Sequence, residues 1–167
     1  MLTPERLIEL LQLAPLPIEG GYFRRTYVAD QPVSSAALPE RYRHARALGS
    51  AIYYLLHDDH FSAMHRLPTD EIYHFYLGDP VEMLLLYPDG SQVVHLLGPD
   101  LEDGQHVQLV APGGVWQGSR VRSGGRYALL GTTMAPAYDP SDFELGDGAA
   151  LARQYPASAT LIAALTH

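Results

Sequence analysis

Three side chains in the middle of the chain have types and spacing suited to acid–base chemistry. His65 and Glu71 lie six positions apart, and Gln117 follows in a later glycine-rich segment. An imidazole and a carboxylate can each take up or return a proton when their surroundings adjust their pKa values. An amide is a neutral donor and acceptor that can orient such groups. These three residues form the centre of a candidate site.

The composition excludes several other chemistries. The chain has 167 residues, no cysteine, and eleven basic residues that are all arginine. Without cysteine there are no thiolate nucleophiles, iron–sulfur clusters or cysteine zinc sites, and without lysine there is no Schiff-base chemistry. The net charge of −8 disfavours nucleic acid as a partner. No apolar run reaches the roughly 20 residues of a membrane helix, so we expect a cytoplasmic protein without a membrane partner.

Short β-strands must position the candidate residues. Apolar and polar residues alternate with a period of two, between Gly, Pro and Asp clusters, which is typical of an all-β sandwich or barrel in one domain, residues 1–167. The predicted strands are 22–28, 50–56, 61–65, 71–77, 81–87, 91–97, 106–110, 115–121 and 126–134.

The flanking segments have other patterns. Thr3 and Pro4 are a helix-start signal, and leucines follow at helical spacing, so we predict an N-terminal helix. Short helices are predicted around 148–154 and 158–165. Residues 29–49 have no clean period and are interpreted as a long loop over the sandwich.

The first motif resembles that of the cupin superfamily, whose members are small antiparallel jelly rolls. His65, Glu71 and Gly78 match the first histidine, the glutamate and the closing glycine of G-x5-H-x-H-x3,4-E-x6-G. Leu67 stands where the second histidine is expected.

The second cupin motif is similar to PGGVWQG at 112–118, with Gln117 in the histidine position. EGGYFRRTY (19–27), SAIYYLL (50–56), FSAMHRLPTDEIYHFYLGDP (61–80) and FELGD (143–147) complete a pattern that looks like one compact cupin subfamily of functionally unassigned proteins. That subfamily is similar in fold to the dTDP-sugar epimerases, which are metal-free cupins. The resemblance implies a cupin-type antiparallel jelly roll, or double-stranded β-helix, and a homodimer.

The resemblance also implies which strand faces line the barrel. In cupins the glutamate face points inward, so Glu71, Tyr73 and Phe75 would lie inside. His65 and Gln117 would then converge on Glu71. We assign His65 as the candidate base, oriented by Glu71, and Tyr73 as the candidate acid.

The same faces supply candidate ligand-binding residues, namely Phe75, Gln117, Ser119 and one of two arginines. Arg24 and Arg25 are adjacent on a strand, so one of them faces inward, and we assign Arg25 to a carboxylate or phosphate of the ligand. Two alternatives remain open: the arginine pairs with Glu19 or another of the 19 acidic residues, and the His–Glu pair is a hydrogen-bonded core network without function.

A metal-binding cupin takes three imidazoles and a carboxylate, and two of those imidazoles are replaced here. We therefore predict no cofactor, while a weakly held divalent metal on His65, Glu71 and Gln117 stays open. The resulting hypothesis is a small-molecule-binding cupin, acting as a metal-independent epimerase or isomerase on a sugar or sugar nucleotide. The alternatives are a metal-dependent oxygenase or isomerase, and a cupin that binds a metabolite such as an organic acid without turnover.

Overall fold

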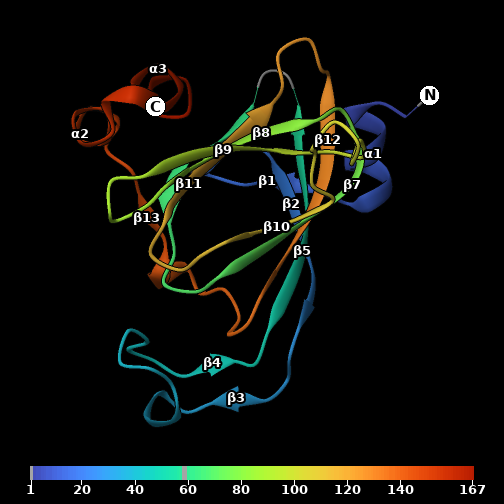
Figure 1. Cartoon of the computed structure of the whole chain (residues 1–167). Coiled ribbons are helices and arrows are strands. Elements are labelled where there is room, and N and C mark those ends of the chain that lie inside the picture. The colour runs from blue at the N-terminus through green and yellow to red at the C-terminus, as the bar shows by residue number, and fades with distance from the viewer. Residues whose placement is uncertain (1, 58–59) are drawn as a thin grey trace.

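Most strands of the computed structural model belong to two antiparallel sheets that face each other (Figure 1), and the structure describes residues 2–57 and 60–167. One sheet has six strands in the spatial order β1 (Ala14–Pro15), β2 (Tyr22–Val28), β5 (Ser50–His57), β12 (Tyr127–Met134), β7 (Glu71–Gly78) and β10 (Gln108–Ala111). The other has five, in the order β13 (Glu144–Leu145), β6 (Phe61–Arg66), β11 (Trp116–Val121), β8 (Val81–Leu86) and β9 (Gln92–Leu97). The predicted mostly antiparallel jelly roll is confirmed.

Strand β8 shows how the core forms between the sheets. Val81, Met83 and Leu85 point into the space between the two sheets, where they pack in the main apolar cluster. Leu84 and Leu86, on the opposite face, pack under the C-terminal helices. A strand covered on both faces is apolar throughout, which explains the continuous apolar run in this segment.

The predicted helices are confirmed at both ends of the chain. Helix α1 (Pro4–Leu11) starts at Thr3, whose hydroxyl accepts a hydrogen bond from the Arg6 amide at 3.3 Å. Helices α2 (Gly148–Gln154) and α3 (Ala159–Ala164) are joined by a short 3-10 turn, η3 (Pro156–Ser158), and cover the outer face of the five-stranded sheet. No helix within the described residues is both long and apolar enough to span a membrane.

The prediction of a plain loop over residues 29–49 is wrong. This segment contains a 3-10 turn, η1 (Ser35–Ala37), and a two-stranded sheet of β3 (Pro32–Val33) and β4 (Arg46–Ala47), which extends from the end of the barrel (Figure 1). Strands of two residues are too short to show a period in the sequence.

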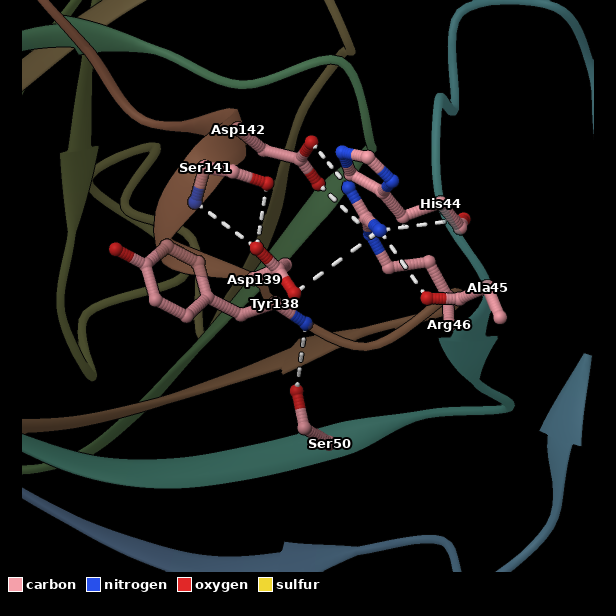
Figure 2. A network of polar contacts seen from close by, with 8 residues as sticks. All are labelled: His44, Ala45, Arg46, Ser50, Tyr138, Asp139, Ser141 and Asp142. Carbon is pink, nitrogen blue, oxygen red and sulfur yellow. Dashed lines mark hydrogen bonds and ion pairs between the residues drawn. The ribbon is translucent and has the colours of Figure 1, made fainter. Parts of the chain in front are cut away.

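A buried arginine ties this excursion to the barrel (Figure 2). The Arg46 side chain is only 2% exposed, and its guanidinium donates to both carboxylate oxygens of Asp142, at 3.2 and 2.6 Å. It also donates to the carbonyls of His44 and Ala45, at 3.2 and 3.1 Å. Asp142 ends another 3-10 turn, η2 (Pro140–Asp142), so the arginine joins two segments that are distant in sequence.

We expect Arg46→Ala to destabilise the protein strongly, by about 3 kcal/mol, because it leaves the Asp142 carboxylate and two carbonyls without their donor. Urea unfolding of the variant and the wild type measures the difference. Arg6→Ala, which removes an exposed ion pair with Glu9 on α1, is the control and should cost less than about 1 kcal/mol. Equal losses in the two variants would contradict the anchoring role of Arg46.

Candidate functional site

A chain of hydrogen bonds joins the three candidate residues across the barrel. His65 on β6 is the direct cross-strand neighbour of Gln117 on β11, and their side-chain nitrogens Nε2 are 3.2 Å apart. The Gln117 amide also donates to Glu71 Oε2 at 2.8 Å. Because β7 belongs to the opposite sheet, this last bond connects the two sheets. The predicted convergence of these residues is therefore present.

The hydrogen bonds define where the hydrogens lie between His65, Gln117 and Glu71. His65 Nδ1 is 2.7 Å from the Ala63 carbonyl oxygen, which can only accept, so Nδ1 carries the proton. The other ring nitrogen, Nε2, then accepts a hydrogen bond from Gln117. The side-chain amide of Gln117 donates one hydrogen to His65 and the other to Glu71. Phe143 stacks on the imidazole with the ring centroids 5.1 Å apart. His65 is thus held in one orientation by Ala63, Gln117 and Phe143.

Glu71 is the buried acid of the site. Burial raises the pKa of Glu71, and the nearby Glu19 carboxylate raises it further, whereas His65 lowers it. Tyr73 donates its hydroxyl hydrogen to Glu71 Oε2 at 3.2 Å. Burial, and then the charge of Glu71, raise the pKa of Tyr73 well above its ordinary value, so this phenol stays protonated.

Glu71 opens onto a cavity of about 230 Å³ inside the barrel. Its wall is mostly apolar and carries a few polar groups, the usual form of a small-molecule site. The polar side chains on the wall are Glu19, Arg25, Ser50, Tyr54, Glu71, Thr132 and Tyr138. The apolar ones include Leu16, Phe23, Ile52, Leu67 and Met134.

The register of β2 identifies which of the two adjacent arginines faces the cavity. Arg25 pairs with Ile52 and lines the cavity at its exposed rim. Arg24 pairs with Tyr53 and lies over that ring at 5.6 Å, on the other face of the sheet.

The other predicted site residues lie behind the cavity wall, which corrects their expected placement. His65 and Gln117 are covered by the neighbours that orient them. Tyr73 is 1% exposed and reaches only Glu71, and Phe75 packs against the apolar core. Ser119 is fully buried, with no hydrogen-bond partner among the described residues. Residues on one face of a strand share a direction, but only those near the mouth contact the open space.

Glu19 and Tyr138 line the cavity and were not predicted as site residues. Glu19 accepts a hydrogen bond from Ser62 at 2.8 Å. It is placed there by Gly20, where φ is +102° and a Cβ atom would lie 2.2 Å from the Phe61 carbonyl oxygen. Only glycine allows this close approach, so the Glu-Gly-Gly segment was an available signal.

Tyr138 follows β12 and is half-buried. Burial and the carboxylates of Glu19 and Glu71 raise the pKa of Tyr138 to about 12. Its backbone amide donates to Ser50 Oγ at 3.1 Å, which holds the residue beside the mouth (Figure 2). This phenol is protonated at neutral pH and adjoins the cavity.

The donor set does not fit the metal site that the resemblance to cupins implies. The imidazole nitrogen and the carboxylate oxygen that would face a cation are already bridged by the amide hydrogens of Gln117. Leu67, in the place of a second imidazole, offers no donor atom. Within the described residues, no three His, Asp or Glu side chains gather as a cation site.

We expect the purified protein to carry well under one equivalent of iron, manganese, nickel or zinc, since one imidazole and one carboxylate bind such ions weakly. Elemental analysis after purification without added metal measures this content. One equivalent of metal that is lost in His65→Ala would overturn the prediction.

We expect Glu71→Gln to be more stable than the wild type at pH 7. A carboxyl group whose pKa is raised by folding costs stability as the pH rises through that pKa, whereas glutamine does not titrate and still offers an acceptor. The difference in melting temperature should shrink as the pH falls toward the ordinary value of a glutamate. A lower melting temperature for Glu71→Gln at pH 7 would show that the network is structural.

Comparison with known proteins places the chain in a family. A family model described as cupin superfamily (DUF985), Cupin_5, matches residues 5–146. The crystal structure of protein SO0799 from Shewanella oneidensis is 29% identical, with a TM-score of 0.88, and the match covers 100% of this chain and 99% of that one. A hypothetical protein from Leishmania major is 28% identical, with a TM-score of 0.88 and 99% of each chain covered.

A curated relative gives a weaker match. The uncharacterised protein YML079W of Saccharomyces cerevisiae is 27% identical over 133 residues, which cover 74% of this chain. The match spans 66% of the yeast protein, just under two thirds of its length. Since the family model covers most of the chain, the protein belongs to the Cupin_5 (DUF985) family of the cupin superfamily.

Proposed function

We propose that this cupin binds a small carbonyl compound in the barrel cavity and moves a proton on it, as an isomerase or epimerase of a sugar or sugar derivative. The observation that carries the proposal is the set of groups on one small wall: two carboxylates, a protonated phenol and a guanidinium. Epimerisation beside a carbonyl needs a base on one face of the carbon and an acid on the other.

Glu71 is the base. The pKa of Glu71 is raised toward neutral pH, and a general base is most effective when its pKa lies near the working pH. Gln117 and Tyr73 both donate to Oε2 of Glu71, and neither donor lines the cavity. These two hydrogen bonds fix the orientation of the carboxylate. His65 acts through Gln117, so His65, Gln117 and Tyr73 are positioning residues in this scheme rather than the base and acid.

Tyr138 is the acid. Glu71 removes the proton from the carbon next to the carbonyl, the C–H electron pair moves into a C–C double bond, and the oxygen becomes an enolate. Arg25 at the rim supplies the positive charge that stabilises that oxygen. The Tyr138 hydroxyl returns a proton to the other face of the carbon, and water then moves the proton from Glu71 back to Tyr138.

A cupin that only binds a metabolite would need the cavity but no proton transfer. The bond from Ser62 to Glu19 and the bonds to Glu71 favour this second candidate, because they satisfy the carboxylates without a ligand. Exchange of substrate hydrogen with solvent separates the two functions.

We expect the protein to incorporate deuterium from D2O next to the carbonyl of keto-sugars, their phosphates or nucleotide-linked sugars, measured by proton NMR. Glu71→Gln should slow incorporation by about 10²-fold or more, and Tyr138→Phe should suppress formation of the second epimer. Tyr27→Phe, an exposed tyrosine of β2 outside the cavity, is the matched control and should leave the rates unchanged. Saturable binding of these compounds without hydrogen exchange would contradict the enzymatic function and support a metabolite-binding function.

A further inference from the structure

A second and larger hollow, of about 770 Å³, lies next to the barrel cavity. Its wall carries four of the eleven arginines of the chain. These are Arg41, Arg43, Arg46 and Arg66, and the acidic side chains on the same wall are Asp70, Asp142 and Glu144. A concentration of arginine is unexpected on a protein with a net charge of −8.

The acidic side chains of the hollow are already engaged. Asp142 is bonded to Arg46, and Glu144 accepts two hydrogen bonds from Arg66 at 2.7 and 2.9 Å. Asp70 accepts from the backbone amide of Gly113 at 2.7 Å. Two arginines, Arg41 and Arg43, therefore have no ion-pair partner among the described residues.

The segment that carries these two arginines is fixed at two buried residues, Tyr42 and Arg46. Tyr42, between them, is 3% exposed, and its hydroxyl is hydrogen-bonded to Thr69 at 2.8 Å. Arg41 lies over the ring of Tyr42 at 4.9 Å. Arg46, three residues beyond Arg43, is the buried anchor bonded to Asp142 (Figure 2). The two buried anchors hold the backbone on both sides of Arg43 and directly after Arg41, which reduces the entropy lost when a ligand binds.

We propose that this hollow binds the phosphoryl group of the ligand, through Arg41 and Arg43. A phosphate ester carries a charge of about −1.5 to −2 at neutral pH and is attracted to Arg41 and Arg43, which outnumber Asp70, the one acidic side chain on this wall without an arginine partner among the described residues. The planar guanidinium also fits phosphate oxygens with paired hydrogen bonds. Bound phosphate relieves the repulsion between like charges that line one hollow.

The two spaces adjoin each other, so one ligand can occupy both. Leu67 lies on the wall of each of them. The turn η2 separates them further along: Pro140 faces the barrel cavity, while Ser141 and Asp142 face the hollow. In this arrangement the ligand places an uncharged, carbonyl-bearing end in the smaller cavity and a phosphate or diphosphate in the larger hollow. The identity of the uncharged end rests on the proposed function, whereas the phosphoryl site does not.

The test is calorimetric titration with inorganic phosphate and pyrophosphate at low ionic strength. We expect saturable binding to the wild type, which Arg43→Ala weakens about tenfold or more, because it loses a charge-assisted hydrogen bond. Arg41→Ala should weaken it similarly. Arg122→Ala, which removes one exposed arginine from a turn outside the hollow, should bind as the wild type does and controls for net charge.

Several results would overturn the site. Equal weakening by Arg122→Ala and Arg43→Ala would mean non-specific attraction, and acetate competing as well as pyrophosphate would mean a carboxylate site. Absence of binding to the wild type would remove the proposal outright. Glu71→Gln separates the two proposals, since it should keep pyrophosphate binding even if the barrel has no proton-transfer activity.

Discussion

The hydrogen bond from Gln117 to Glu71 is the constraint on which the candidate site depends. Most of the contact between the two sheets is made by an apolar cluster, whose side chains can slide and repack. A bond of 2.8 Å between a buried amide and a buried carboxylate has a direction, so it fixes β11 relative to β7 at one point. His65 and Tyr73 then complete the shell around that point.

Cavity and hollow have opposite electrostatic character. Glu19 and Glu71 face the same small cavity, where burial, and then the charge of Glu19, raise the pKa of Glu71. Arginines dominate the neighbouring hollow, and half of those on its wall are neutralised by acids. A molecule with an anionic end and a proton-donating end therefore has one preferred orientation across the two spaces. Charge distribution sets this orientation without any additional contact.

Much of this fold was predictable because alternation along a strand is a local property. The strand predicted at 22–28 is β2 with the same bounds, and the face shared by Glu71 and Tyr73 is buried as expected. Glu19 and Tyr138 were missed because they lie just outside strands, in segments where no period links sequence to direction. Which of two adjacent arginines faces inward was also undetermined until the pairing of β2 with β5 was known.

Leu67 connects the two departures from the cupin motif. It stands in the position of a histidine, and its side chain instead forms part of the wall of both the cavity and the hollow. A donor at this position would draw a cation toward His65 and Glu71, and Gln117 would then have to give up one of its two hydrogen bonds. An apolar side chain here leaves the amide bridge intact. The leucine in one histidine position and the amide in another are thus mutually consistent, because together they leave the hydrogen bonds of Gln117 to His65 and Glu71 intact.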